Sequence, residues 1–426
     1  MATDVDVQFF SHLNGLTLDN NWGDLIRMLD KALVSGIDFT QITAVSIDAQ
    51  GDVHITLYAA HNAMLFQVVE LTGFAPASLN QKYRIKGVPS TTELILKPHT
   101  VIVETSITTV GAGKLASLGY DIIFRDTNDV KRVYRSKNPT AQHPFIRIDE
   151  SLTSPDGTTG VYTSTYAKYA MVGLLEYMEH IDDYENPDVL QLPFDPSDPA
   201  KNWEITGTGT GVVRGWAKWI WATINEAINT ATTLSKPPTN KPRLFTLVGD
   251  SDAFYLLNSR GVGERKLIAG CGVFDSVHAD SNITPEWFLM STLNTTTADS
   301  DFPTVNAQGG ASLAYNAGAA TFFVSKKDTS VSSSHTVASP VLPDLMTGAS
   351  DLYSATHIAA LQIPFSDAEK NLRGTLKHVA YSGNSLEQAS TTPLLSGSSM
   401  YVYDHLTATS ATISKGGLYF YLGELE

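Results

Sequence analysis

The sequence predicts a β-rich α+β protein, made of several small antiparallel β-modules of sandwich or barrel type with a few packed helices. Short runs of alternating apolar and polar residues, bounded by turn residues, recur along the chain. Only three longer stretches carry the 3.6-residue period of a helix. With 426 residues, of which 42% are hydrophobic and 17% charged, the chain is globular and long enough for two or three domains.

Residues 52–97 are the clearest of these modules. Four short strands are predicted in it, with the sequences HITLY, FQVVEL, KYRIKGV and ELILKP. Gly51, the Gly73–Pro76 stretch and Pro89–Ser90 supply the turns that bound them. The module is compact, and none of its side chains forms an obvious catalytic pattern.

A helix is predicted ahead of this module. Asn20 or Asn21 can cap its start, and Gly36 can end it. The apolar residues expected on its buried face are Trp22, Leu25, Ile26, Leu29 and Leu33. This face is expected to pack on the β-module, which gives a first domain over residues 1–98.

Residues 99–160 are predicted to be a β-rich extension of the first domain. Its expected strands are TVIVETSITTV (residues 100–110), YDIIFRD, KRVYRS and PFIRIDE. Thr127–Asp129 joins the second and third of these as a hairpin turn.

A mixed helix and strand domain is predicted over residues 161–290. Helical periodicity covers residues 162–180 and again 216–234, and the runs LFTLVGD and AFYLL then form a strand pair. The last domain, residues 291–426, is expected to be a β domain. Its Ser- and Thr-rich stretch 291–340 is predicted to be an assembly arm that becomes ordered on contact with a neighbouring subunit.

The charge balance argues against a surface for duplex nucleic acid. The formal net charge is −15, with 44 acidic residues against 29 basic ones, and phosphate binding needs clustered lysine and arginine. The densest basic run, Arg125–Lys137, is interrupted by acids and is predicted to be a solvated strand pair. An ionic contact with an acidic neighbouring subunit is the functional alternative.

The single cysteine, Cys271, excludes an intrachain disulfide framework and a thiolate metal site. Its apolar, glycine-rich surroundings, IAGCGVF, predict a buried and inert thiol. The first residues, MATDVDVQFF, carry acids where a signal peptide is basic, and no apolar run reaches the length of a membrane span. We therefore expect no secretion signal, no membrane span and synthesis in the cytoplasm.

The sharpest catalytic pattern is LVGDSDAFY at residues 247–255, which resembles the nucleophile block of GDSL-type esterases. In that interpretation Ser251 is the nucleophile, His278 is its base, and Asp275 orients the imidazole. Only 27 residues separate Ser251 from His278, whereas that family places the two groups roughly a domain apart, and its Gly and Asn blocks are missing. A Gly-Asp turn between two strands is therefore the preferred interpretation.

The other polar patterns are predicted to be structural. GTGTGVVRG at residues 207–215 lacks the Lys-Ser/Thr of a P-loop. His61 is expected to be a satisfied turn or core histidine, and no histidine pair has the helical spacing of a zinc enzyme. The acids between residues 182 and 198 lack the pattern of a calcium loop and are expected to form a solvated loop. The sequence therefore predicts no catalytic residue, no cofactor and no metal site.

Three tryptophans in WAKWIWATI are the candidate interface residues. On the predicted helix, Trp216 and Trp219 share a face, while Trp221 points elsewhere. Packing in the core explains the first two, and Trp221 is left for a contact with another subunit, where tryptophan often concentrates binding energy.

The sequence of the 52–97 module resembles small β-domains of tailed-bacteriophage virion proteins. The resemblance rests on the Ala60–His61 step and on the runs LTGF, LNQKYRIKGV and STTELIL. A weaker similarity to uncharacterised virion proteins covers residues 216–276. The resemblance supplies no catalytic residue.

The resemblance implies a non-enzymatic structural component of a phage virion, assembled with its own copies into a symmetric ring or sleeve at the tail or neck. A tail-sheath or collar component of an N4-like short-tailed phage is the favoured kind. The expected partners are copies of the chain and other tail, portal or appendage proteins, with no nucleic acid sequence recognised and no membrane bound. The alternatives are a receptor- or glycan-binding module of a tail fibre or baseplate and, further off, a GDSL-like esterase.

Overall fold

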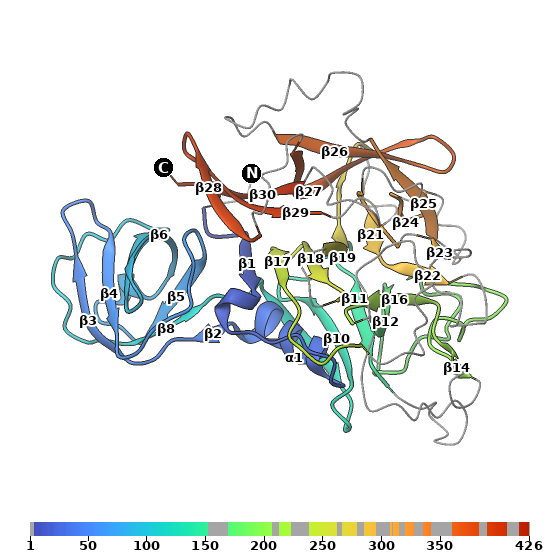
Figure 1. The fold of residues 1–426 in the computed structure, drawn as a ribbon, viewed down its shortest axis with the longest axis horizontal. Helices are drawn as coiled ribbons and strands as arrows, with labels where there is room; N and C mark the ends of the chain where they lie inside the picture. The colour runs from blue at the N-terminus through green and yellow to red at the C-terminus, as the bar shows by residue number, and fades with distance from the viewer. Residues whose placement is uncertain are drawn as a thin grey trace.

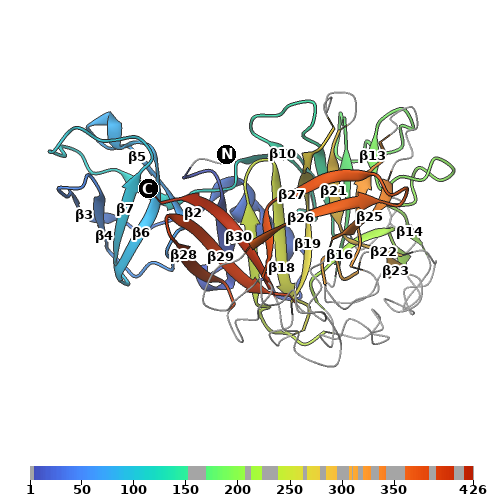
Figure 2. The same cartoon turned by 90° about the horizontal axis from the view of Figure 1, so that it is seen from above.

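The computed structural model describes the following residues: 4–151, 169–206, 213–222, 238–261, 266–278, 285–294, 307–308, 310–314, 320–327, 335–341, 360–382, 390–406 and 417–425. Within them, antiparallel β-sheets dominate and one helix of more than one turn lies near the N-terminus. The predicted fold class, a β-rich α+β protein with antiparallel sheets and packed helical structure, is therefore confirmed. Figures 1 and 2 show a small module, at the left in blue, beside a larger body.

The small module is a seven-stranded sheet in the order β2-β8-β5-β6-β7-β4-β3. Its strands are β2 (Ile37–Asp38), β3 (Ile42–Ile47), β4 (Val53–Leu57), β5 (Val68–Thr72), β6 (Lys82–Ser90), β7 (Glu93–Pro98) and β8 (Ala112–Leu115). The four strands predicted between residues 52 and 97 are confirmed as β4 to β7. The sheet also takes β8 from beyond residue 98, the predicted end of the first domain.

A second sheet has the order β23-β22-β16-β12-β11-β10-β9, with β13 on β12. Its strands are β9 (Tyr120–Arg125), β10 (Lys131–Ser136), β11 (Phe145–Asp149), β12 (Tyr169–Leu175), β13 (Gln191–Leu192), β16 (Ala217–Ile220), β22 (Thr292–Asn294) and β23 (Ala307–Gln308). β14 (Ile205–Thr206) and β15 (Val213–Arg214) form a separate pair. The predicted hairpin of YDIIFRD and KRVYRS is confirmed as β9 and β10.

Two predicted helices are wrong where the structure describes them. Tyr169–Leu175 is strand β12 and Ala217–Ile220 is strand β16, and the two strands pair with each other. Every residue of both strands is buried. A strand that is apolar on both faces carries no alternation, so its residues also fit a helical stripe by chance. Residues 162–168 and 223–234 lie outside the described residues.

The largest sheet runs β1-β17-β18-β19-β21-β24-β25-β26-β27-β30-β29-β28, with β20 on β27. Its strands are β1 (Gln8–Ser11), β17 (Phe245–Gly249), β18 (Ala253–Ser259), β19 (Lys266–Val273), β20 (Asp275–Ser276), β21 (Trp287–Met290), β24 (Phe322–Ser325), β25 (His335–Pro340), β26 (Ala360–Asp367), β27 (Leu372–Ser382), β28 (Thr392–Ser396), β29 (Ser399–His405) and β30 (Gly417–Glu424). The predicted pair LFTLVGD and AFYLL is confirmed as β17 and β18.

This sheet is curled, so strands far apart in its order face each other across an apolar core. The ring of Tyr255 on β18 lies 5.8 Å from that of Phe420 on β30. Lys266 on β19 forms a fully buried ion pair with Asp404 on β29, at 2.7 Å from Nζ to Oδ2. The last strands, β26 to β30, curve over the top of the body in Figure 1.

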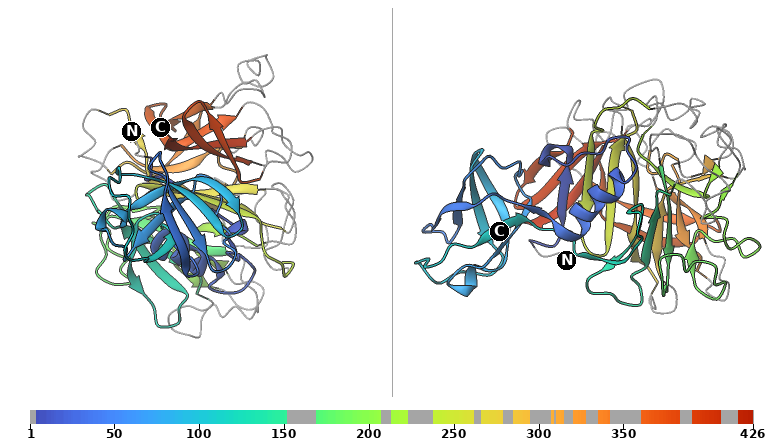
Figure 3. Two further views of the ribbon diagram at one scale, coloured as in Figure 1. Left: turned by 90° about the vertical axis from the view of Figure 1, so that its left-hand side faces the viewer. Right: turned by 90° about the horizontal axis from the view of Figure 1, so that it is seen from below.

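The predicted N-terminal helix is confirmed as α1 (Asp24–Leu29), which continues as the π-helical segment η2 (Asp30–Ser35). Its N-cap is Gly23 rather than Asn20 or Asn21. Gly36 ends it at a φ of +73°, where an added Cβ would lie 2.1 Å from a backbone oxygen. Figure 3 shows the helix lying along the larger body. The short turns η1 (His12–Asn14) and η3 (Ala77–Leu79) complete the described helical elements.

Residues 100–110, predicted to be a strand, belong to no sheet in the structure. They follow β7 as an extended connection and reach β8 after an isolated bridge between Thr109 and Ala75. Their β-branched sequence has strand character, but no strand of the described chain lies in register beside them. Sheet pairing depends on a neighbour that local sequence does not specify.

Arg84 on β6 joins the small module to the largest sheet. Its buried guanidinium donates to the carbonyls of Asp4 (2.6 Å), Val7 (3.0 Å) and Phe66 (2.6 Å), and to that of Leu422 on β30 (2.8 Å). Burial lowers the Arg84 pKa to about 9, opposed by the charges of two nearby aspartates. The side chain therefore stays protonated at neutral pH and connects the N-terminal residues, the module and the C-terminal strand.

Gln8 on β1 strengthens the same junction. Its Nε2 donates to the carbonyls of Val68 and Ala116, both at 2.8 Å, and its Oε1 accepts from the Val68 N–H at 2.9 Å. One amide thus satisfies three backbone groups of the module while its own strand pairs with β17 of the large sheet.

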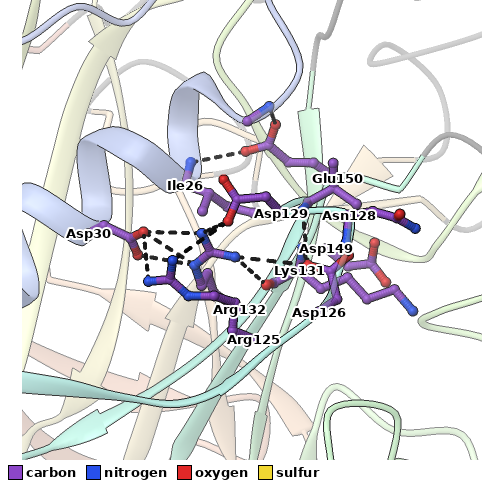
Figure 4. A network of polar contacts seen from close by, with 12 residues as sticks. Ile26, Asp30, Arg125, Asp126, Asn128, Asp129, Lys131, Arg132, Asp149 and Glu150 are labelled. Carbon is purple, nitrogen blue, oxygen red and sulfur yellow. Dashed lines mark hydrogen bonds and ion pairs between the residues drawn. The ribbon is translucent and has the colours of Figure 1, made fainter.

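The helix is held on the second sheet by buried charged groups, drawn in Figure 4. Arg132 on β10 is 1% exposed, and its guanidinium contacts the carboxylates of Asp30 and Asp129. The prediction that the Arg125–Lys137 run is solvated is therefore wrong for Arg132, because acids of its own chain surround it. The carboxylate of Glu150 accepts from the N–H groups of Gly23 and Ile26, at the start of α1.

Replacing Arg84 with methionine is expected to lower the free energy of unfolding by roughly 3–5 kcal/mol, because four carbonyls lose their donors. Chemical denaturation followed by tryptophan fluorescence measures the change. Lys114→Met on β8 of the same module is the matched control, since the side chains of Lys114 and of its partner Glu70 are 32% and 37% exposed. An exposed pair of this kind is worth less than about 1 kcal/mol. Equal losses in the two variants would contradict the role given to Arg84.

Glu150 is expected to make stability fall as pH rises. Burial raises its pKa to about 7, against the two N–H groups and Arg214, which act in the opposite direction. The folded state therefore holds a proton that the unfolded chain releases near its ordinary value of 4.5. The resulting stabilisation, on the order of 3 kcal/mol, is complete below that value and is lost as pH rises through about 7.

Glu150→Gln removes this titration and keeps one acceptor oxygen for the helix. The slope of unfolding free energy between pH 5 and pH 8 should therefore be shallower in the variant than in the wild type. Urea titrations across that range measure both slopes, and parallel curves for the two proteins would refute the assignment to Glu150.

Candidate functional site

A cleft of about 930 Å³ opens where the turn between β17 and β18 meets strand β27. Its walls combine carboxylates, amines, an imidazole and two tyrosines that come from distant parts of the sequence. The lining residues used below are Ser251, Asp250, Asp252, Asp275, Lys377, His378, Tyr401 and Tyr421.

The β17–β18 turn is shaped by Asp250. Its Oδ1 accepts from the N–H groups of Asp252 (2.8 Å) and Ala253 (3.1 Å), which closes the turn by a side chain. Gly249 precedes it, where an added Cβ would lie 2.1 Å from the Ala253 carbonyl oxygen. The Gly-Asp turn predicted from the sequence is therefore confirmed, and its residue types follow from the close approach of the two strands.

Strand β27 bulges opposite this turn. In the pairing with β26, Gln362 lies opposite Ala380 and Pro364 lies opposite Thr375. The chain therefore advances by five residues on β27 where it advances by two on β26. His378 lies in the bulge with a φ of +62°, a left-handed conformation uncommon for a residue with a side chain. The hydroxyl of Tyr255 supports the bulge by donating to the Lys377 carbonyl at 2.9 Å.

The bulge and the turn are joined by ion pairs. His378 Nε2 lies 2.7 Å from Asp250 Oδ2, and Lys377 Nζ lies 2.5 Å from Asp252 Oδ2. The second oxygen of Asp252 lies 2.8 Å from Nε2 of His143, which comes from the loop before β11. Asp252 therefore connects three segments of the chain, and every one of these charged groups is occupied by another.

These contacts shift the ionisation of the two aspartates. The hydrogen bond from His143, opposed by burial and aided by Lys377, holds the pKa of Asp252 well below its ordinary value. Burial raises the pKa of Asp250, but the hydrogen bond and charge of His378 outweigh it, so the net shift is downward. Burial lowers the pKa of Lys377, but the hydrogen bond to Asp252 and the charges of the nearby aspartates raise it by more. The net shift of the Lys377 pKa is therefore upward. Asp250, Asp252 and Lys377 therefore carry their charges at neutral pH.

The esterase-like pattern does not assemble into a triad. Ser251 and Asp275 both line the cleft, but His278 does not. Asp275 lies 3.7 Å from Lys377, and His278 Nε2 has no hydrogen-bond partner in the described part of the chain. The imidazoles of His378 and His143 bind Asp250 and Asp252, the residues on either side of Ser251, through their Nε2 atoms.

The three candidate interface tryptophans lie on and beside strand β16 rather than on a helix. Trp219 and Trp221 are 2% and 1% exposed, and their indole N–H groups donate to the carbonyls of Met290 and Asp19. Trp216 is half-buried, with the Lys201 amine 4.3 Å from its ring centroid. Packing within the chain therefore accounts for Trp219 and Trp221, and only Trp216 keeps some surface.

Cys271 is buried, as predicted, and burial raises its pKa well above the ordinary range. His61 is a turn histidine, whose Nδ1 accepts from the Ala63 N–H. In the acidic loop, Asp182 pairs with Lys131 and Arg147, so part of that loop is neutralised by its own chain.

Over the residues that the structure covers, no group of three His, Cys, Asp or Glu side chains has the geometry of a metal site. None of the described helices has the length and apolar character needed to cross a membrane. Residues 207–212 of the glycine-rich loop lie outside the described residues, as does most of the predicted arm at 291–340. The described parts of that arm include strands β22, β24 and β25 of the two larger sheets.

Sequence reasoning found the turn but missed its partners. Ser251 and its flanking aspartates are visible as a turn motif, whereas His143 and His378 lie 109 and 128 residues away from the aspartates that they contact. The bulge that aims His378 at the turn leaves no local pattern. Only the pairing of strands across the sheet reveals it.

No family model matches the chain, and no curated protein matches it either. Among solved structures, the chain is similar to one described as "Phage phi92 endosialidase", with 8% sequence identity and a TM-score of 0.14. The match covers 91% of this chain and 50% of that one, so the chain spans about half the length of that structure. At this TM-score the similarity carries no argument about fold or function.

Asp252→Asn is expected to destabilise the protein at neutral pH, because it weakens the links to His143 and Lys377. A lowered carboxylate pKa stabilises above the ordinary value of 3.8, and this contribution is lost as pH falls below it. The stability gap between wild type and variant should therefore shrink below about pH 4. Thermal unfolding across pH measures the gap.

Asp275→Asn is the matched control for this measurement. Asp275 lines the same cleft and contacts the same lysine, but its side chain is 64% exposed. The control should change stability little at any pH. If both variants lose the same stability, or if the Asp252→Asn gap persists in acid, the bridging role of Asp252 is wrong.

Proposed function

We propose that this chain is a structural component of a tailed-phage virion, which acts by assembling with copies of itself into a ring or sleeve at the tail or neck. A tail-sheath or collar role in a short-tailed phage is the finer form of this proposal. The observation that carries it is the 100–110 segment, which has the sequence of a strand but is exposed and belongs to no sheet. Uncovered strand-competent surface of this kind favours association with another chain.

The open ends of the sheets support the same proposal. In the described part of the chain, β3, β9 and β28 each have one neighbouring strand and end their sheets. Such end strands present backbone donors and acceptors along one side. Exposed apolar side chains lie on two of them, Ile123 on β9 and Leu395 on β28. The resemblance of residues 52–97 to virion β-domains points the same way.

The organisation of the cleft also favours a structural role. Its aspartates, lysine and imidazoles bind each other and hold the turn, the bulge and the loop before β11 together. Ser251 lies in the same turn, and the hydrogen bonds of the described residues include none between Ser251 and an imidazole, while His378 and His143 bind Asp250 and Asp252. The imidazoles and carboxylates that would have to transfer protons in a hydrolase instead bind one another.

A receptor- or glycan-binding role is the second candidate, and a specific observation favours it. The cleft is lined by Tyr401 and Tyr421, whose ring centroids are 5.6 Å apart, together with carboxylates and the amides of Asn138 and Gln362. Aromatic rings next to hydrogen-bonding side chains suit the apolar faces and hydroxyls of a saccharide. In this alternative the protein is a fibre or baseplate tip.

The oligomeric mass of the purified chain separates these roles. The ring or sleeve predicts assemblies of about six or twelve copies, the closed cyclic states expected for such particles. Mass photometry and negative-stain images of the full chain measure this directly. Three copies in an elongated particle would favour the receptor-binding alternative. A monomer at all accessible concentrations would overturn the proposed assembly.

A further inference from the structure

The 100–110 segment exposes two apolar side chains to an extent unusual for a folded protein. Val101 and Val103 are 81% and 83% exposed, whereas Ile102 between them is 7% exposed. This alternation is that of a strand with one face on its own module and the other outward. Two neighbouring valines on one outward face form a small apolar patch that intrachain packing does not explain.

The backbone of this segment is anchored at both ends but is not paired with another strand between them. At its start, the His99 N–H donates to the Lys82 carbonyl at 3.2 Å, and at its end the Thr108 N–H donates to the Ala75 carbonyl at 2.9 Å. Between these anchors, residues 101–107 make no backbone–backbone hydrogen bond to any described segment. The segment is therefore pre-organised for strand pairing, so little conformational entropy remains to be lost on binding.

The charge around the segment indicates what covers it. Residues 100–110 carry one charged side chain, Glu104, in a chain of net charge −15. That carboxylate is turned into its own module, where it accepts from the Ser78 hydroxyl at 2.8 Å. This hydrogen bond lowers the Glu104 pKa. A basic partner would be drawn to the acidic surface elsewhere, whereas two acidic copies approach best through a neutral strip.

We infer that the 100–110 segment pairs antiparallel with the same segment of a second copy, about a two-fold axis through Ile102. In this register Val101 lies opposite Val103 of the other copy and Val103 opposite its Val101, so the outward valines pack side by side as cross-strand pairs on one face. Glu104 lies opposite Thr100, and no like charges meet. The inference builds on the proposed assembly role, for which it names one contact, and such a contact by itself joins two copies.

Cysteine cross-linking tests the register. The natural Cys271 is buried, so variants of the full chain that carry one added, exposed cysteine give a low background. A mixture of Val101→Cys and Val103→Cys should form disulfide-linked dimers faster than either variant alone, because opposite residues lie nearer than diagonal ones. Val88→Cys, on β6 of the same module and 40% exposed, is the control for random collision. Cross-linking of the mixture no faster than the control would overturn the inference.

A charge variant provides the second measurement. Val101→Lys combined with Val103→Lys should weaken self-association at least tenfold in analytical ultracentrifugation, while circular dichroism stays that of the folded chain. Higher salt should strengthen wild-type association, because it screens the repulsion of acidic copies; weakening by salt would contradict pairing of like chains. Rings that form normally from the double variant would overturn this contact alone. A wild type that never associates would overturn both the contact and the proposed function.

Discussion

One guanidinium holds the two halves of this molecule together. Arg84 belongs to the small module, yet its donors satisfy carbonyls of the N-terminal residues and of β30, the last described strand. Arg84 holds the residues just before β1, at Asp4 and Val7, and β1 itself pairs with β17 at the edge of the large sheet. The buried amide of Gln8 then aligns β1 with the module on its other side. Both chain ends are therefore tied to the module, and the apolar core continues from the module into the larger sheets.

Much of the module could be predicted from sequence, and the reason is local. Strands β4 to β7 are short, half-buried and bounded by turns, so alternation and turn residues identify them. Strands β12 and β16 are buried on both faces, and their apolar runs fit a helix equally well. The 100–110 segment shows a third situation. Its extended conformation follows from its β-branched residues, but the lack of a partner strand is a property of the whole fold.

The cleft was only half visible in the sequence for the same reason. The Asp250–Asp252 turn is local, while Lys377 and His378 reach it through a bulge in a strand more than a hundred residues later. Left-handed conformations such as that of His378 persist where surrounding contacts over-determine them. Here the ion pair with Asp250 and the Tyr255 hydroxyl beneath the bulge provide those contacts. Contacts from β18 and from the β17–β18 turn therefore hold His378 in its left-handed conformation.

The contrast between the cleft and the valine patch bears on how such a chain works. In the cleft, charged groups satisfy one another, so little binding capacity is left in them. At Val101 and Val103, apolar area and backbone groups remain uncovered. A two-fold contact there joins only two copies, because each copy contributes the same surface and that surface is then buried in both. Closing a ring therefore requires a second contact between unlike surfaces. The end strands β9 and β28 belong to different sheets and carry exposed Ile123 and Leu395, so they offer unlike edges of the kind that a head-to-tail contact needs.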